Sequence, residues 1–534
     1  MRNLKPFWFI IPLVTLVAAG IFFFVNSSSE TGEEIVVSIP YNRYVRSIDT
    51  NYYKQWLEAQ TGLSIKFNII YENNTAEYLH SMFASGYVQS DAFFSFISGE
   101  ELIDYNAIVQ EFGDAGYIIP LNTYIERSKN LNFIFEEYPE YDLRSLMTSP
   151  DGNMYYMPGF DPSMPESHYQ VLWLNQNWLN RLNIKMPRST EEFRYMLYAF
   201  KTADPNGNGI QDEIPLAGSR DTPGEQVYDF IINAFVYNDP FNSRFYVEDS
   251  IIHFAPITEG WREAMQYLND LYREGLISPF QFTAGHNELA AIANDPQSVL
   301  GGFASKSITD VVFNSNSQII NGFTHLAPIA TPDGIRRATA VTPMPRPAGV
   351  ITSSCKNPEA VFMLLDLMMS EEAFLIGRYG EQNVDWMPAH ISDIDFYGRT
   401  AAIKVINHLR NRVQNKHLNE MVPFFAYPKY ADSVTFTAFE ASQEYRDARA
   451  YRAYEQFKPH DYIRTIHFSG ADSNDLYDLR RAVDLLTEEH IEAFITGTKN
   501  PFDDNVWEAY IREYEKISID VLLSAVQMDY NKQN

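Results

Sequence analysis

The segment from residue 35 to residue 70 constrains the fold most, because a strand pattern, a helix pattern and a second strand pattern follow one another there. Residues 35–39 read Ile-Val-Val-Ser-Ile, a mostly β-branched run that is typical of a strand buried on both faces. A helix is predicted over residues 51–61, ending at Gly62, and a second strand over residues 63–70. A β-α-β unit requires a mainly parallel sheet covered by helices, so we predict an α/β fold.

The same alternation continues along the chain. A strand is predicted at residues 171–174, followed by a short helix at 177–182 and a longer helix that Ser189 caps and that runs to Lys201, with Glu192 at capping-box spacing. Further strands are predicted at residues 90–97 and 298–303, and further helices at 257–275, 358–367 and 476–495, with a helix start near residue 98. At 534 residues the chain is too long for one compact core, so two large lobes are expected.

Charge and cysteine content exclude several functions. The formal net charge of −28 argues against nucleic-acid binding, because a polyanion would be repelled. A neutral or cationic ligand fits the negative electrostatic potential of such a protein better, unless a local basic pocket overrides that potential. The single cysteine, Cys355, excludes an internal disulfide framework and a cysteine-based zinc site, and it lies too deep in the chain to be a lipid anchor. We interpret it as a buried thiol.

The N-terminus predicts export. Arg2 and Lys5 precede residues 7–25, which carry no charge and are long enough to span a bilayer as one helix. The run is longer than a usual signal-peptide core, and positive charge before it places the remainder of the chain outside the cytoplasm. We predict an uncleaved signal-anchor in the cell membrane. The alternative is cleavage after Ser27, which would give a secreted or periplasmic protein.

Residues 204–213, Asp-Pro-Asn-Gly-Asn-Gly-Ile-Gln-Asp-Glu, predict a calcium loop. Oxygen ligands occupy alternate positions, and glycines stand where the backbone must turn. The predicted ligands are the side chains of Asp204, Asn206, Asn208 and Asp212, with Glu213 as a fifth side chain and the carbonyl of Ile210. The loop departs from the EF-hand at its twelfth position, where Pro215 replaces the bidentate glutamate. A plain acidic turn is the alternative. Because the loop carries no nucleophile, we expect a structural clamp.

A series of short motifs then resembles extracellular solute-binding proteins of family 1. Residues 151–158, Asp-Gly-Asn-Met-Tyr-Tyr-Met-Pro, are similar to the crossover motif of that family. In order there follow 173–175 (Trp-Leu-Asn), 178–179 (Trp-Leu), 186–193 (Met-Pro-Arg-Ser-Thr-Glu-Glu-Phe), the loop at 204–213, 214–216 (Ile-Pro-Leu), 268–277, 351–360, 378–380 with 385–386, 493–497 and 507–510. The resemblance covers roughly residues 34–530. It depends on the whole series of motifs in this order, because each motif is weak alone.

The chain looks most like the large oligosaccharide-binding subgroup, which includes alginate-binding proteins and lipoproteins of the LipO/LplA type. The resemblance implies a structural calcium ion in the loop, two lobes of the type II periplasmic-binding-protein fold joined by a hinge crossed more than once, and a monomer that closes on a sugar and delivers it to an ABC permease. Those lipoproteins begin with a lipobox cysteine, which this chain lacks. Lipid attachment is therefore not implied, and the membrane partner is the N-terminal helix.

This resemblance suggests three regions. Residues 1–30 would form the anchor and linker. Residues 34–156 with about 340–390 would form lobe 1, and residues 157–339 with about 391–534 would form lobe 2, which carries the calcium loop.

Sugar recognition needs flat apolar rings and fixed polar groups. In open α/β sheets ligands bind at the carboxyl ends of strands, so residues 41–43 and 96–98 should border a cleft. The predicted ligand-binding residues are the aromatic Tyr41, Phe96, Trp173, Phe303 and Trp386, and the polar Asn42, Arg43 and Arg378. Arg43 would matter most for an acidic sugar, because a guanidinium group grips a carboxylate bidentately.

The leading hypothesis is therefore an exported oligosaccharide-binding subunit of an ABC importer, with no catalytic residue. A membrane-tethered sugar receptor or sensor is one alternative. A carbohydrate-active enzyme is another, although no paired-carboxylate motif is recognisable.

Overall fold

A computed structural model describes residues 34–71, 79, 81–83, 85, 88–95, 105–313, 317–409, 412–418, 421–437, 443–468 and 473–533. The predicted membrane anchor at residues 7–25 and the predicted site residue Phe96 lie outside this set. Within the described part, none of the helices combines the length and the apolar character that crossing a bilayer demands.

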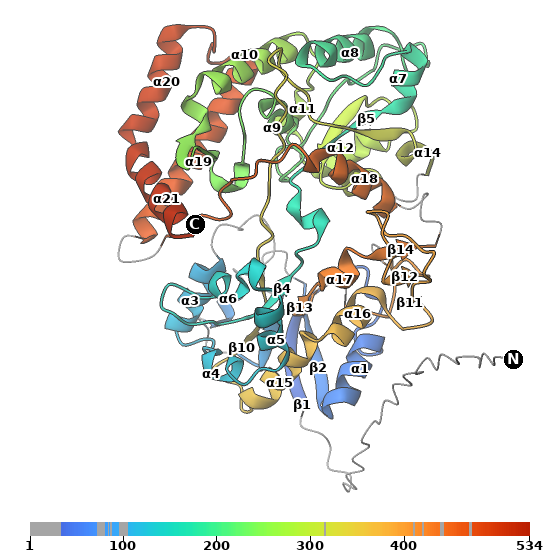
Figure 1. Cartoon of the computed structure of the whole chain (residues 1–534), viewed down its shortest axis with the longest axis vertical. Coiled ribbons are helices and arrows are strands. Elements are labelled where there is room, and N and C mark those ends of the chain that lie inside the picture. Colours follow the sequence, from blue (N-terminus) through green and yellow to red (C-terminus); the bar gives the residue numbers. More distant parts are fainter. Residues whose placement is uncertain are drawn as a thin grey trace, which may run out of the picture.

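The described chain forms two lobes, one above the other in Figure 1. Each lobe has its own hydrophobic core. The lower, first lobe is built around buried residues of the N-terminal strands, such as Val37 and Phe93, and the upper, second lobe around Trp173, Trp261 and their neighbours. Because the two cores are separate, the lobes can move relative to each other without exposing either core.

The first lobe contains a six-stranded mixed sheet in the order β13-β4-β10-β3-β1-β2. Its strands are β1 (Glu34–Pro40), β2 (Ser64–Ile70), β3 (Ala92–Phe94), β4 (Met157–Phe160), β10 (Arg346–Ile351) and β13 (Phe424–Phe425). Strand β1 runs parallel to β2 and β3, while β10 is antiparallel to β3 and β4. The predicted parallel β-α-β unit at residues 35–70 is therefore confirmed.

Helices cover the sheet of the first lobe (Figure 1). They are α1 (Tyr52–Thr61), α3 (Tyr105–Asp114), α4 (Asn122–Ile125), α5 (Asn130–Glu137), α6 (Leu143–Leu146), α15 (Pro358–Met368), α16 (Glu371–Tyr379) and α17 (Pro428–Ala431). Helix α1 ends as predicted at Gly62, whose φ of 71° lies in the left-handed region that favours glycine. A small sheet of β11 (Trp386–Pro388), β12 (Ile403–Val405) and β14 (Val434–Phe436) is attached to this lobe.

The second lobe has a smaller sheet under a thick layer of helices. Strand β5 (Val171–Asn175) pairs antiparallel with β8 (Gly302–Ser305) and β9 (Phe323–Leu326), and β6 (Phe245–Glu248) forms a hairpin with β7 (Ile251–Phe254). The helices are α7 (Gln176–Leu182), α8 (Thr190–Thr202), α9 (Val227–Ile232), α10 (Glu259–Arg273), α11 (Phe280–Thr283), α12 (His286–Ala293), α13 (Ile308–Val311), α14 (Ser317–Ile320), α18 (Gln443–Glu455), α19 (Ser473–Thr496), α20 (Asp504–Lys516) and α21 (Ile519–Gln533).

The chain passes between the lobes at three places: after β4, before β10, and between β14 and α18 (Figure 1). This differs from the predicted boundaries in two ways. Strand β4 belongs to the sheet of the first lobe, so the first crossing follows residue 160 instead of 156. The return to the second lobe follows residue 436 instead of 390, because Ile403, Val405 and Val434 pack in the first core.

Candidate functional site

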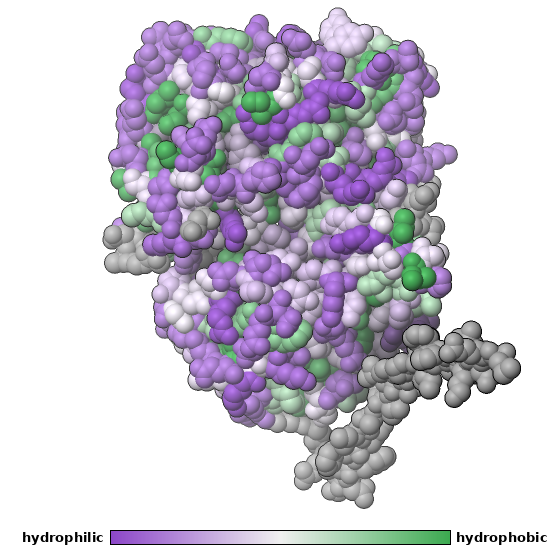
Figure 2. Space-filling view, in the orientation of Figure 1, coloured by the Kyte–Doolittle hydropathy of each residue, from purple (hydrophilic) through white to green (hydrophobic). Residues whose placement is uncertain are grey.

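A cavity of about 180 Å³ lies between the two lobes. Three parts of the chain line it. The first lobe contributes the end of α16 and strands β12 and β14, the second lobe contributes α13 and α18, and the first crossing contributes residues 163–166. In the space-filling view, hydrophilic residues dominate the visible face, including the region where the lobes meet (Figure 2). The walls of this cavity thus come from both lobes.

The wall from the first lobe is built where α16 ends. Arg378 and Tyr379 line the cavity, and Gly380 follows with a φ of 90°. The turn after Gly380 is held by two side chains: the indole N–H of Trp386 donates to the Gly380 carbonyl at 3.0 Å, and the Asp385 carboxylate accepts from the N–H of Glu381 at 2.9 Å. Trp386 is itself 6% exposed. It supports the turn beside Arg378 from beneath.

The wall from the second lobe is built where β8 ends. Ser307 follows this strand and caps α13, while Asp310 accepts from the Ser307 N–H at 2.8 Å. Asp447, on α18, accepts from the Ser307 hydroxyl at 2.6 Å and from the N–H of Ile308 at 3.3 Å. These bonds tie α18 to the start of α13, so the third crossing is fixed to the second lobe at the cavity.

The first crossing forms one side of the cavity. The N–H of Met164 donates to Asp432 at 3.0 Å, which joins the crossing to the first lobe, and Glu166 pairs with Lys306 of the second lobe. Asp161, at the start of the crossing, pairs with Arg378 at 2.9 Å. The crossing therefore makes polar contacts with both walls.

Two carboxyl groups of the cavity have strongly raised pKa values. Burial raises the pKa of Asp447 to about 7, with the charges of Asp310 and Glu444 adding to the rise against the hydrogen bonds to Ser307 and Ile308. Burial also raises the pKa of Asp432 to about 6, and the nearby Asp161 carboxylate adds to it. Perturbed carboxyl groups in a cleft are typical of functional sites.

The predicted aromatic ligands lie beneath the cavity walls instead of in them. Trp173 and Phe303 are 1% and 0% exposed in the core of the second lobe, where their strands β5 and β8 pair directly. Trp386 is buried likewise. A buried ring presents no face to a ligand, so in this conformation these three residues position the walls. The indole of Trp173, for example, donates to the carbonyl of Ser305, two residues before Ser307.

The other predicted ligand residues are divided between the cavity and the end of β1. Arg378 lines the cavity. Tyr41 follows β1, is 56% exposed, and stacks on Tyr71 at the end of β2 with ring centroids 5.2 Å apart. Asn42 accepts from the Tyr44 N–H, and the Arg43 guanidinium lies 5.6 Å from the centroid of the Tyr44 ring. These two exposed tyrosines follow the ends of the parallel strands β1 and β2. Ligands of open α/β sheets bind at the carboxyl ends of strands.

The carboxylates of the cavity were missed by the sequence reading. Asp447 lies in α18, a polar segment in which charged residues alternate with tyrosine and alanine and which reads as a solvated helix. The available signal was the spacing of Asp447, Tyr451 and Tyr454, which places the three on one buried face. Asp432 follows the four-residue helix α17 and carries no pattern signal.

The side chains of the predicted calcium loop bond to one another and to the backbone of the loop. The Asp204 carboxylate accepts from the N–H groups of Gly207 and Gly209, and the side-chain amides of Asn206 and Asn208 donate to Asp212 at 3.0 Å and 3.0–3.2 Å. Within the described part of the chain, no three His, Cys, Asp or Glu side chains form a group that could hold a metal. Asparagine and backbone oxygens are ordinary calcium ligands besides carboxylates.

Glu213 indicates that the calcium loop suits a cation. One of its carboxylate oxygens is buried without a hydrogen-bond partner. Burial raises the pKa of Glu213, and the charges of Asp212 and Asp204 add to the rise. An oxygen-rich site with a buried carboxylate lacking a donor fits a hard cation such as calcium.

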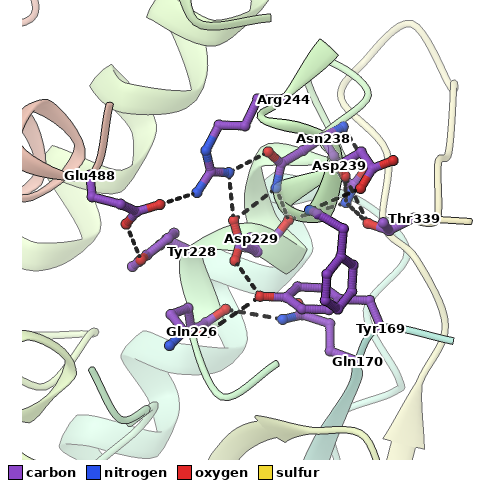
Figure 3. A network of polar contacts seen from close by, with 12 residues as sticks. Tyr169, Gln170, Gln226, Tyr228, Asp229, Asn238, Asp239, Arg244, Thr339 and Glu488 are labelled. Carbon is purple, nitrogen blue, oxygen red and sulfur yellow. Dashed lines mark hydrogen bonds and ion pairs between the residues drawn. The ribbon is translucent and has the colours of Figure 1, made fainter. Parts of the chain in front are cut away.

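A buried polar network anchors the hinge to the second lobe (Figure 3). At its centre, Arg244 pairs with Asp229 at 2.9 Å and with Glu488 at 2.6 Å, and Asn238 donates to Asp229 at 2.8 Å. Tyr169, just after the first crossing, donates to the other oxygen of Asp229 at 3.0 Å. This hydrogen bond connects the first crossing to the network.

The second crossing reaches the network through Thr339. Its hydroxyl donates to the Asn238 carbonyl at 2.8 Å and accepts from Asn233 at 3.0 Å, while the N–H of Ala340 donates to the Tyr237 hydroxyl at 3.1 Å. Burial raises the pKa of Asp229, and the Arg244 guanidinium opposes that rise. The network therefore depends on Arg244, which neutralises a fully buried carboxylate.

Replacing Arg244 with methionine should destabilise the protein strongly, because Asp229 would stay buried without its cation. The expected loss of unfolding free energy is about 3–5 kcal/mol. Arg262→Met is the matched control, since Arg262 also pairs with a carboxylate and lies over a tryptophan ring, but its partner Asp504 is 83% exposed. That control should lose about 1 kcal/mol or less. Equal losses in urea denaturation would contradict this role for Arg244.

The raised pKa of Asp447 predicts a pH-dependent stability. A carboxyl whose pKa is about 7 when folded binds more protons in the folded than in the unfolded state, so stability falls as pH rises from about 4 to 7. Asp447→Asn removes this cost, which reaches about 4 kcal/mol at most. The melting temperature of the variant relative to the wild type should therefore rise between pH 5 and pH 8.

Asp393→Asn is the opposite control. Hydrogen bonding to the His390 N–H and to Lys404 lowers the pKa of Asp393, so its contribution is present at neutral pH and lost in acid. A melting-temperature difference for Asp447→Asn that does not change with pH would show that this carboxyl titrates normally.

Comparisons with known proteins bear on the fold. No protein-family model matches the chain. The chain is 24% identical over 487 residues to the fructooligosaccharide ABC transporter substrate-binding protein FusA of Streptococcus pneumoniae serotype 4 (strain ATCC BAA-334 / TIGR4), which spans 90% of this chain and 86% of FusA.

Solved structures show the same architecture. The S. pneumoniae FusA complex with kestose matches with a TM-score of 0.75 at 21% identity, over 94% of this chain and 99% of the other, and an EF-hand mutant of FusA in complex with fructo-nystose gives the same values. A human-milk-oligosaccharide (HMO) binding, ABC-transporter-associated solute-binding protein from Bifidobacterium longum infantis matches with a TM-score of 0.74 at 17% identity, over 94% and 99%. The alginate-binding protein AlgQ2 without calcium ion matches with a TM-score of 0.66 at 17% identity, over 94% and 99%. The resemblance predicted from the motifs is thus confirmed: the chain has the two-lobed α/β fold of ABC-transporter solute-binding proteins.

Proposed function

We propose that this protein is the oligosaccharide-binding subunit of an ABC importer, which captures its ligand between the lobes and delivers it to a permease. The observation that carries the proposal is the cavity between the lobes, whose walls come from both lobes and from a crossing segment, in a fold shared with solute-binding proteins. The similarity to FusA, a binding protein for fructooligosaccharides, supports the ligand class. The function is binding, with no catalytic step.

The cavity offers what a sugar requires. Tyr379, Phe436 and Tyr451 supply apolar ring surface, and Asp432, Asp447 and other polar side chains supply hydrogen-bond acceptors and donors. The exposed rings of Tyr41 and Tyr71 lie at the ends of parallel strands, where a longer ligand would extend. Asn42 and Arg43 remain candidates in the same region, and Phe96, which lies outside the described residues, remains a candidate from the sequence.

Ligand capture should be coupled to closure of the lobes. A sugar that contacts both walls binds the closed state better than the open state, and this differential affinity shifts the equilibrium toward closure. The network around Arg244 keeps two of the crossings attached to the second lobe, so bending would be concentrated between that network and the first lobe.

The loop at residues 204–213 is proposed to hold a structural calcium ion. The side chains of Asp204, Asn206, Asn208, Asp212 and Glu213 and the carbonyl of Ile210 would supply its oxygens. The partnerless Glu213 oxygen supports this assignment, as does the similarity to FusA, a protein for which an EF-hand mutant has been solved. The ion would stiffen the second lobe, because the loop follows α8 and leads into Ile214, which bridges to Leu300.

An extracytoplasmic location follows from this function. We propose that residues 7–25 anchor the protein in the cell membrane with both lobes outside the cytoplasm, and that it acts as a monomer. A tethered receptor that presents sugar to a sensor would use the same cavity. Uptake of the bound oligosaccharide should stop when the gene is deleted, and unchanged uptake would favour the receptor.

Binding should close the protein without turnover. In small-angle X-ray scattering with kestose, maltotriose, cellotriose, xylotriose and mannotriose, at least one sugar should decrease the radius of gyration, because the lobes approach each other. Chromatography of the same mixture should recover that sugar unchanged. Release of shorter sugars would instead indicate an enzyme, and the absence of binding across a wider oligosaccharide library would contradict the proposal.

Calcium should reverse the effect of one substitution. Without calcium, Glu213→Gln should raise the melting temperature, because it removes a buried charge beside two other carboxylates. With calcium it should lower the melting temperature, since a ligand is lost. Chelation of the wild type should cost about 3 kcal/mol of stability relative to calcium at a hundred times its Kd. A change of the same sign in both conditions would contradict the metal assignment.

A further inference from the structure

The cavity between the lobes carries an excess of negative charge. Among its lining residues, five are carboxylates, Glu166, Asp310, Asp432, Glu444 and Asp447, whereas the permanently charged cations are Lys306 and Arg378. Both cations are already engaged by carboxylates: Lys306 pairs with Glu166, and Arg378 pairs with Asp161 at 2.9 Å. A third basic group of the lining, His408, pairs with Glu444. Each of these three groups is therefore neutralised locally.

Two carboxylates of the cavity form no ion pair with a described side chain, although Arg399 donates to the backbone carbonyl of Asp432 at 3.0 Å. Asp447 accepts from the Ser307 hydroxyl, the Ile308 N–H and the amide of Gln443, all of which are neutral donors. Asp432 accepts from the Met164 N–H. Among the described side chains, none forms an ion pair with either carboxylate. Asp432 comes from the first lobe and Asp447 from the second, so a ligand that enters between the lobes meets a carboxyl group without an ion-pair partner on each side. Both groups are negatively charged at a pH above their raised pKa values of about 6 and about 7.

Carboxylates are acceptors only, and hydroxyl groups are donors that match them. A neutral sugar can therefore donate hydroxyl hydrogen bonds to Asp432 and Asp447. A uronate or sulfated sugar would bring a further negative charge into a partly buried space, where screening by water is weak. The charge of Arg378 is already partly offset, because its guanidinium donates to Asp161 at 2.9 Å.

We propose that this cavity selects uncharged oligosaccharides and rejects anionic ones, with Asp432 and Asp447 as the residues that determine this specificity. The inference rests on the proposed function, because it assigns a ligand class to the same cavity. It also sets this chain apart from a binding protein for an acidic sugar, since such a protein needs a cation free to meet a carboxylate. The fold itself accommodates both kinds of ligand.

The test compares matched neutral and acidic sugars on the full-length chain. Kestose, maltotriose, cellotriose, xylotriose and mannotriose would each be titrated calorimetrically, beside a derivative in which one hydroxyl is converted to a carboxylate-bearing group. The pH would be about 8.5, so that Asp432 and Asp447 are both ionised. For every neutral sugar that binds the wild type, the acidic derivative should bind about tenfold more weakly or worse, because like charges repel strongly in a protein interior. An acidic derivative that binds as tightly as its neutral parent, or more tightly, would overturn the proposal.

Substitutions in the cavity and on the surface separate local from global charge. Asp432→Asn and Asp447→Asn, alone and combined, should reduce the discrimination to about threefold or less, since the amides keep the shape and remove the repulsion. Glu508→Gln removes one negative charge from the exposed surface of α20 and should leave the discrimination unchanged. If Glu508→Gln has the same effect as the cavity variants, the net charge of the protein is responsible and the proposal is wrong.

The outcomes also distinguish this inference from the function on which it rests. Binding of neutral and acidic forms with equal affinity would leave oligosaccharide capture intact and remove the charge selectivity. If no sugar of either form binds, oligosaccharide capture itself fails, and the specificity assignment falls with it. Circular dichroism of each variant establishes that a loss of binding is not a loss of folding.

Discussion

The separation of the hydrophobic interior into two cores is the constraint on which the rest of the structure depends. Val37 and Phe93 belong to one core and Trp173 and Trp261 to the other, and the chain passes between them at three places. Neither lobe encloses the main cavity alone. The space between the lobes therefore has walls that can approach or separate at little cost in buried apolar area, which is the physical requirement for capture by closure.

Buried charge has two different uses in this protein. Around Asp229, the charge is neutralised by Arg244, and every neighbour donates or accepts a hydrogen bond, which fixes two crossings to the second lobe. At Asp447, burial has no cation to offset it, so the carboxyl keeps a high pKa. The neutralised Asp229 suits a segment that holds the crossings in place. Asp447 suits a binding site, because a hydrogen-bond donor from a ligand would stabilise its charged form.

The sequence predicted an element correctly where a residue type strongly favours one local structure. The β-branched run at residues 35–39, Gly62 at the end of α1 and Ser189 at the start of α8 each predicted their element correctly. Strand β5 was assigned to the right residues, but its antiparallel neighbours lie more than a hundred residues away and could not be read from local pattern. The predicted boundary at residue 391 failed for the same reason, since β12 pairs with β11 in the first lobe.

Several predicted site residues lie near the cavity walls, but the rings among them do not line the cavity. Phe303 and Trp386 lie within a few residues of the walls formed by Ser307 and Arg378, yet both rings are buried supports. Aromatic residues attract attention as sugar ligands, whereas a carboxylate in a charged helix such as Asp447 looks like ordinary surface. A crystal structure of the protein with an oligosaccharide bound tests the central claim most directly. We expect sugar between the lobes with hydroxyl groups on Asp432 and Asp447, whereas sugar bound outside this cavity would exclude this binding site.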